Sequence, residues 1–298
     1  MKTGIFLTAL LMLTAGSAWA AAKHPDLVVE SVQMPAWVEH ANGAREALRL
    51  GATLVNQDKV YTGPNARARL RLADGSTVKL GENAQLGLAD LGQQKDKLKS
   101  LVTATLDVLS GAFRFTTQAI YKFHGERDVT VKLVTITAGI RGTDIWGKHT
   151  DERDVLALLE GQITVVHGNE AFTMNEPRSV YTAPKEGAPP PVAPLDPRQL
   201  AAWALETEIV PGGGAVSAGG KWKVHVATAA TQEAALALYD KLGDAGYAVD
   251  IRPVMQEGNI VYRLRISHLP SRREAQILAA QLKAQQDQLG IGEPTIGK

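Results

Sequence analysis

The sequence predicts an all-β domain followed by a smaller α+β domain, and three observations support this division. Residues 26–183 contain short alternating apolar and polar runs separated by Gly, Asn and Pro turn signals. Residues 221–298 repeat a strand, a helix and a strand. Residues 184–220 between them are rich in Pro and Gly, as linkers often are. With 298 residues and 45% hydrophobic content, the chain is long enough to bury two cores.

The strands of the first domain follow from period-two alternation. Gly63-Pro64-Asn65 and Asp74-Gly75 separate the first of them, so hairpins and tight turns are expected. Many short strands of this kind favour a sandwich, a barrel or a flattened β-coil over a parallel α/β sheet. The clearest predicted strands are 60–62, 66–72, 76–80, 129–133, 155–159, 162–167 and 179–182.

The linker combines a stiff part with one short helix. Pro189-Pro190-Pro191 favours an extended polyproline segment, and a spacer of this kind lets two domains move independently. Asp196-Pro197 has the chemistry of a helix start, which predicts a helix over 197–208 with Leu200, Trp203 and Ala204 on one side. Because short helices are marginal alone, we expect this one to dock on the preceding domain.

In the second domain, Trp222, Val224 and Val226 alternate with polar or small residues and predict the first strand. Thr231 can cap the first helix, and Ser271-Arg272-Arg273-Glu274 has the spacing of a capping box for the second. A last, weak strand is expected within 291–296. The expected fold is a four-stranded antiparallel sheet with two helices on one face and the other face uncovered. The uncovered face would carry Lys223, His225, Asp250, Arg252, Val261, Arg263 and Arg265.

Three runs in this domain, residues 222–226, 241–247 and 262–275, resemble the SPOR (sporulation-related) domain in their order and spacing. The resemblance implies a βαββαβ fold that binds peptidoglycan glycan strands stripped of their stem peptides, which accumulate where amidases act during cell division. It implies a binding module and no catalyst. Carried over by position, the implied binding residues are His225, Thr228, Val261, Arg263 and Arg265. The family usually has Gln in place of His225 and an aromatic or other large residue in place of Val261.

The first domain resembles the FecR family over about 38–165, most specifically in the run from Thr135 to Asp144, Thr-Ile-Thr-Ala-Gly-Ile-Arg-Gly-Thr-Asp. The resemblance implies a periplasmic all-β module. Family members that signal across the inner membrane also have a cytoplasmic anti-sigma segment and a membrane helix, and neither is recognised here. We therefore expect the domain to act as a scaffold or a platform for a periplasmic protein partner.

Residues 1–20 have the features of a cleavable signal peptide. Lys2 is followed by an apolar stretch over 5–13 and by the cleavage pattern Ala18-Trp19-Ala20, which predicts export to the periplasm. No later stretch is long and apolar enough to span a membrane. Without Lys2 the chain has 31 Lys and Arg against 31 Asp and Glu, so its charge does not suggest a nucleic-acid partner. It has no cysteine and therefore no disulfide or thiolate chemistry.

No motif predicts an enzyme, a cofactor or a metal site. The seven histidines are scattered, and the common zinc-protease, serine-hydrolase and phosphate-loop patterns are missing. The acidic cluster of Asp151, Glu152 and Asp154 falls at a predicted hairpin turn, and Arg141 and Asp144 are positioned to pair across a tight turn. Arg67, Arg69 and Arg71 alternate on one strand, where they form a solvated face or line an acidic or sugar ligand.

Three functions stay open on this basis. The first is non-catalytic binding of peptidoglycan by the second domain. The second is a periplasmic sensor or adaptor that binds a protein through the first domain. The third, least supported, is an enzyme that cleaves the cell wall. RNA binding through the same strand order is not supported, because the third strand presents Val261, Arg263 and Arg265 where RNA-binding domains present stacking aromatic residues.

Overall fold

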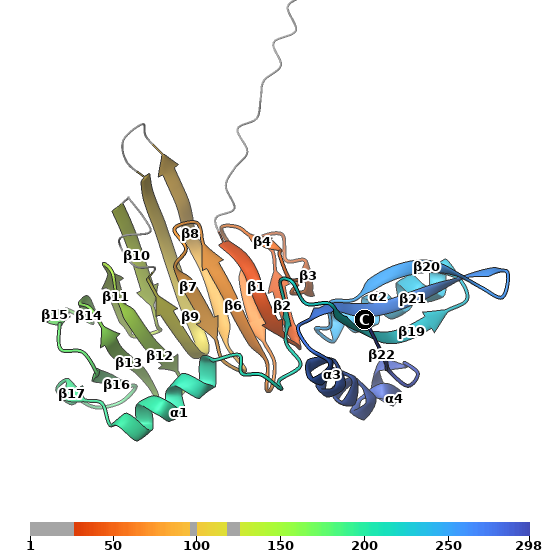
Figure 1. The fold of residues 1–298 in the computed structure, drawn as a ribbon. Helices are drawn as coiled ribbons and strands as arrows, with labels where there is room; N and C mark the ends of the chain where they lie inside the picture. The colour runs from red at the N-terminus through yellow and green to blue at the C-terminus, as the bar shows by residue number, and fades with distance from the viewer. Residues whose placement is uncertain (1–26, 96–99, 118–125) are drawn as a thin grey trace, which may run out of the picture.

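The computed structural model describes residues 27–95, 100–117 and 126–298, which form a β domain and a smaller α+β domain (Figure 1). The predicted signal peptide lies outside these residues. Within them, no helix is both long and apolar enough to cross a membrane. The two-domain fold class predicted from the sequence is confirmed.

Two sheets, A and B, build the β domain, and every strand pair in them is antiparallel except β9 with β10. Sheet A contains β1 (Leu27–Gln33), β4 (Thr53–Leu54), β6 (Arg67–Leu72), β7 (Thr77–Leu80), the second part of β9 (Ser100–Thr116), β12 (Asp144–His149), β13 (Arg153–Glu160), β16 (Ser179–Pro184), β17 (Ala193–Pro194) and β18 (Val216–Ser217). Sheet B contains β2 (Ala36–Glu39), β3 (Arg45–Ala47), β5 (Lys59–Thr62), β8 (Gln85–Lys95), the first part of β9, β10 (Glu126–Lys132), β11 (Ile136–Ile140), β14 (Ile163–His167) and β15 (Glu170–Met174).

Strand β9 belongs to both sheets and joins them into one sandwich. Up to Ser110 it pairs with β8 in sheet B, and from Gly111 onward it pairs with β12 in sheet A. Gly111 has a φ of +75°, and a Cβ atom there would lie 2.6 Å from the Cα of Ala84, so this position requires glycine. The inward side chains of both sheets, such as Leu70 and Leu86, form one buried core.

Much of the Pro- and Gly-rich segment is bound to sheet A, which differs from the free spacer expected from its composition. Strand β17 pairs with β16, and β18 pairs with β1. Helix α1 (Pro197–Thr207) starts where predicted, with the Asp196 carboxylate accepting a hydrogen bond of 2.7 Å from the backbone N–H of Arg198. Its predicted docking is confirmed, because Trp203 stacks on Trp146 with ring centroids 4.4 Å apart. Backbone N–H and C=O groups of this segment therefore find hydrogen-bond partners on the strands of sheet A, which its composition does not predict.

The C-terminal domain has the predicted four-stranded antiparallel sheet in the order β20-β21-β19-β22. Helices α2 and α3 cover one face, where Leu242 and Leu278 join Val224 and Leu264 in the core. The elements are β19 (Trp222–Ala229), α2 (Gln232–Asp244), β20 (Asp250–Gln256), β21 (Asn259–Leu269), α3 (Arg272–Ala284), α4 (Gln286–Leu289) and β22 (Thr295–Gly297).

The two domains contact each other directly between β2 and the end of α2. The backbone N–H of Ala36 donates to the carbonyl of Gly246 over 3.1 Å, and Trp37 Nε1 donates to the carbonyl of Asp244 over 3.0 Å. Gly246 has a φ of +82°, and a Cβ atom there would lie 2.7 Å from the Trp37 ring. The contact therefore depends on a glycine for both backbone conformation and space.

Candidate functional site

The uncovered face of the C-terminal sheet brings all five predicted binding residues together. Cross-strand register places His225 of β19 opposite Arg265 of β21, and Arg265 opposite Asp250 of β20. On the other side of His225 lies Thr295 of β22. One row of side chains thus crosses all four strands on the face that points away from the helices.

A second row lies beside the first. Thr228 is opposite Arg263, and Arg263 is opposite Arg252. One step further along β21, Val261 faces Val254. Because directly opposed residues in an antiparallel pair lie roughly 5 Å apart, ligand groups that bridge the two rows can reach several of these side chains at once.

His225 lies among positive charges, and its protonation state follows from that environment. Burial lowers the pKa of His225, and the neighbouring charges of Arg263, Lys223 and Arg265 lower it further. The imidazole is therefore neutral at pH 7, so its ring nitrogens provide one donor and one acceptor. A neutral ring suits hydrogen bonding to hydroxyl and amide groups.

Three buried polar atoms on or beside this row have no hydrogen-bond partner within the described part of the chain. They are Nδ1 of His225, Nε of Arg265 and Oγ of Ser267. Buried polar groups are nearly always paired, and an unpaired one costs about 1–3 kcal/mol. Each of these atoms has almost no accessible surface, so a ligand pairs with them only if neighbouring side chains move, and they mark a polar region of the sheet face.

The face lacks the aromatic platform that the SPOR resemblance predicts at position 261. Val261 is half-buried and aliphatic, and its neighbour Tyr262 points to the helix-covered side, where it packs on the core. The imidazole of His225 is the one ring that the described residues place on this face. The face therefore offers hydrogen bonds and charge to a ligand, and little surface for ring stacking.

The β domain contacts the sheet at its edge strand β20 through Arg49, a contact that the sequence did not predict. The Arg49 guanidinium donates to Tyr239 Oη over 2.7 Å and to the carbonyl of Val249 over 2.8 Å, and it lies 3.4 Å from the carboxylate of Asp250. Asp250 is the end of the row that contains Arg265. No local pattern around Arg49 signals this role, because its partners lie about 200 residues away.

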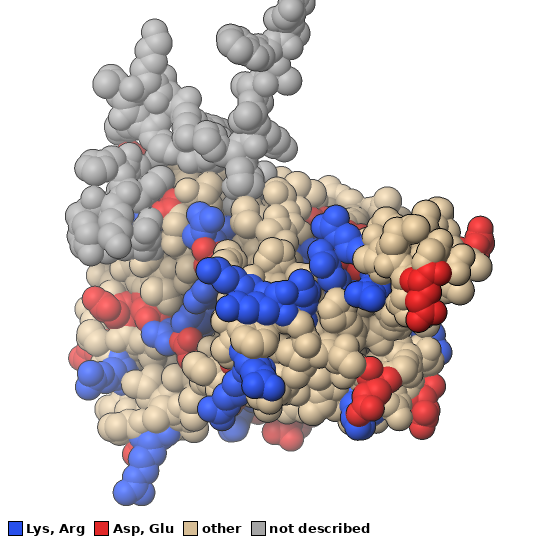
Figure 2. Space-filling view, turned by 45° about the vertical axis from the view of Figure 1, so that its right-hand side comes forward, with Lys and Arg blue, Asp and Glu red and all other residues tan. Residues whose placement is uncertain are grey.

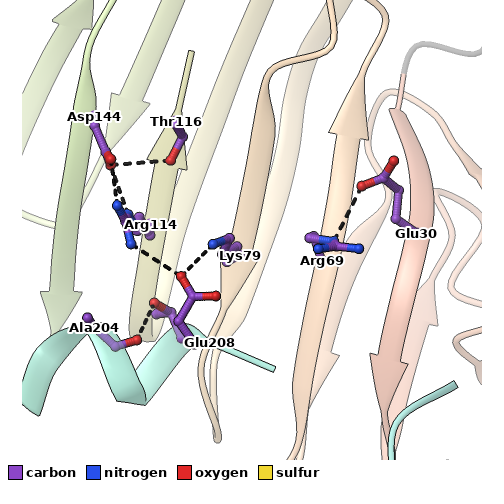
Figure 3. A network of polar contacts seen from close by, with 9 residues as sticks. Glu30, Arg69, Lys79, Arg114, Thr116, Asp144, Ala204 and Glu208 are labelled. Atoms are coloured by element: carbon purple, nitrogen blue, oxygen red, sulfur yellow. Dashed lines mark hydrogen bonds and ion pairs between the residues drawn. The ribbon is translucent and has the colours of Figure 1, made fainter. Parts of the chain in front are cut away.

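Two expectations for the β domain are corrected. Asp144 does not pair with Arg141 across the turn: its carboxylate takes two hydrogen bonds, of 2.9 and 2.6 Å, from Arg114 on the adjacent strand (Figure 3). A cross-strand neighbour competes better because its side chain lies directly opposite or diagonal on the same face. The acidic cluster at the β12–β13 turn is split, since Asp154 is 1% exposed and binds Thr135 and His149.

Comparison with known proteins finds two families in the predicted order. The model of the FecR protein family matches residues 58–164, and the model of the SPOR domain matches residues 218–290. No curated protein sequence matches the chain. Two crystal structures of an anti-sigma-factor candidate from Parabacteroides distasonis resemble it, with 12% and 14% identity and TM-scores of 0.39 and 0.38. These alignments cover 68% and 78% of this chain and 97% and 91% of theirs, and at this level of similarity they say nothing about function.

Proposed function

Because the chain carries a FecR-like region followed by a SPOR domain, we propose that it is a non-catalytic periplasmic protein that binds peptidoglycan through the uncovered face of its C-terminal sheet. The preferred ligand is the glycan strand without stem peptides. The observation that supports this most is the row of His225, Arg265 and Asp250 across the uncovered face. Residues 1–20 serve as the export signal in this proposal.

The charge of the C-terminal domain favours a neutral or weakly charged polymer. Residues 221–298 contain ten Lys and Arg against eight Asp and Glu, an excess of two positive charges. Proteins that hold polyanions through phosphate contacts use many more cations on one face. A glycan from which amidases have removed the stem peptides offers hydroxyl and acetamido groups and one lactyl carboxylate per muramic acid. These groups match the neutral imidazole of His225 and the guanidinium donors of Arg263 and Arg265.

Sedimentation with purified sacculi tests this proposal. The chain without residues 1–20 is mixed with sacculi, with and without prior amidase digestion, and the pelleted fraction is measured. We expect amidase digestion to increase binding. If it does not, preference for stripped glycan strands is refuted.

A paired variant locates the site. Replacing both His225 and Arg263 by Ala should reduce pelleting about tenfold, since each side chain supplies roughly one hydrogen bond of 0.5–1.5 kcal/mol. The matched control replaces Lys241 and Arg272 by Ala. Both are exposed and belong to the helices, away from the sheet face. Equal binding by the two double variants would remove His225 and Arg263 from the site.

A function in binding a protein partner is a second candidate. It is favoured by the outer face of sheet A, where Arg69, Lys79 and Arg114 lie opposite one another on neighbouring strands.

An enzymatic function would require release of soluble muropeptides from sacculi by the purified chain. We expect no release, and detection of muropeptides above a no-protein control would replace the binding proposal with a hydrolytic one.

A further inference from the structure

The outer face of sheet A carries a row of basic side chains. Arg69 of β6 is opposite Lys79 of β7, and Lys79 is opposite Arg114 of β9. Adjacent strands lie about 4.8 Å apart, so these three cations fall within roughly 10 Å of each other. Arg67 and Arg71 flank Arg69 on the same side of β6.

The charge of this face is unbalanced within the sheet itself. Along β1, β6, β7, β9 and β12 it has six basic side chains against two carboxylates, Glu30 and Asp144, an excess of four positive charges in these described strands. The six basic residues on these strands are Arg67, Arg69, Arg71, Lys79, Arg114 and Lys148. In the space-filling view of Figure 2, basic side chains gather in a band across the middle of the molecule.

One end of this face already binds an acidic segment, the end of α1 and the residue that follows it. Glu206 accepts from Lys148 over 2.8 Å. Glu208 accepts from Lys79 over 2.5 Å and from Arg114 over 3.2 Å (Figure 3). Together with the stacking of Trp203 of α1 on Trp146, these contacts show that the outer face of sheet A binds carboxylates carried by a peptide segment of the same chain.

Arg67 belongs to the occupied end, because its guanidinium donates to the carbonyl of Leu205 in α1 over 3.4 Å. The part of the face toward β1, formed by Arg69 and Arg71, is open. The Arg69 and Arg71 side chains are 45% and 47% exposed, and both lie beside the carboxylate of Glu30, at 3.4 and 2.6 Å. Residues two apart on a strand are about 7 Å apart on one side, and alternate side chains of an extended peptide have the same spacing. An extended segment with alternate carboxylates therefore matches Arg69 and Arg71 in both charge and distance, and Arg favours carboxylates through paired hydrogen bonds.

We propose that this open part, formed by Arg69 and Arg71, is a docking surface for an acidic segment of a partner protein. The segment lies on β6 in an extended form and places alternate carboxylates on Arg69 and Arg71. This locates the second candidate function on one face and defines the chemistry of the partner. It does not depend on glycan binding by the other domain.

Fluorescence anisotropy tests the proposal on the chain without residues 1–20. The probe is a labelled twelve-residue peptide that alternates Glu and Ala, and its comparison peptide has Gln in place of Glu. We expect binding of the Glu peptide only, weakened as salt rises from roughly 50 to 200 mM because the contacts are exposed. The double variant Arg69→Glu and Arg71→Glu should weaken binding about tenfold.

A matched double variant, Lys132→Glu with Arg272→Glu, changes the net charge equally at exposed positions on β10 and α3. We expect it to bind the peptide within about twofold of the unmodified chain. Arg69→Gln with Arg71→Gln repeats the test without charge reversal. The proposal is overturned if the Glu peptide does not bind, if both charge-reversed variants bind it equally, or if inorganic polyphosphate binds while the peptide does not. Sacculus pelleting of the same variants should be unchanged, so the two proposals can fail separately.

Discussion

Replacing Glu274 by Ala should be one of the most destabilising changes in the C-terminal domain. Its carboxylate is 6% exposed and accepts hydrogen bonds from the backbone N–H groups of Gly212 and Gly214, the second over 2.6 Å. These bonds connect the first turn of α3 to the segment that leads into β18. Hydrogen bonds to a charged group contribute about 1.5–3 kcal/mol each. The Gly214 bond is buried, whereas water can partly replace the Gly212 bond, so we expect a total loss of about 3–4 kcal/mol.

Urea unfolding of the chain without residues 1–20 measures this loss. Glu233→Ala is the matched control, because Glu233 occupies the first turn of α2 but is exposed, and its loss should cost about 0.5 kcal/mol. Glu274→Gln keeps one acceptor oxygen but places an N–H₂ group against a backbone N–H. Its loss of unfolding free energy should therefore lie between the losses for Glu274→Ala and Glu233→Ala. A cost for Glu274→Ala within about 1 kcal/mol of that for Glu233→Ala would show that the carboxylate does not hold the segment.

Three further changes test other parts of the structure. Gly246→Ala should lower the free energy of unfolding by about 2–4 kcal/mol, because the backbone there is left-handed and the added methyl group would overlap with Trp37. It should also separate the two domains. An unchanged radius of gyration by X-ray scattering would contradict the docked arrangement. Trp203→Ala should lower the free energy of unfolding by about 1–2 kcal/mol and remove the circular-dichroism signal of the indole pair that Trp203 forms with Trp146. Persistence of that signal would refute the stacking. Because the pKa of His225 is lowered on folding, the unfolded chain binds a proton more readily, and stability should fall as pH drops below about 6.5. That fall should be smaller in His225→Gln by urea unfolding at pH 7 and pH 5, and equal falls would remove His225 as a cause.

Local periodicity placed most, but not all, of the candidate site. Alternation around Val224 and Leu264 assigned side chains to faces, because a strand residue can point to only two sides, but a β-bulge between His225 and Ala227 turns Ala227 to the core and Thr228 to the uncovered face. That assignment placed His225 and Arg263 on the uncovered side without any knowledge of strand order. Figure 1 shows the helices on the opposite side, as amphipathic helices beside such a sheet require.

The capping box shows where local pattern stops being sufficient. The hydroxyl of Ser271 accepts from the backbone N–H of Glu274 over 3.2 Å, as the spacing predicts. The other half of the motif predicts that Glu274 reaches back to the start of its own helix. In the structure its carboxylate binds Gly212 and Gly214 instead, because the folded chain brings two further backbone donors to it.

Long-range partners explain the other differences. The transfer of β9 from one sheet to the other at Gly111 depends on Ala84, and the ion pair of Asp144 depends on Arg114. The register of strands separated by many residues is set when the whole core forms, and no nearby residue encodes it.

The chain's sequence was enough for the two-domain class, for most faces of its strands and helices and for the open sheet face, because periodicity acts within a few residues; the bulge that inverts the faces after His225 was not predicted. Only the tertiary structure revealed that the Pro- and Gly-rich segment is held to sheet A, that Arg49 joins the β domain to Asp250, and that one basic face binds its own acidic helix end. Each of these depends on groups far apart in sequence, whose distances are set by the packing of the complete fold.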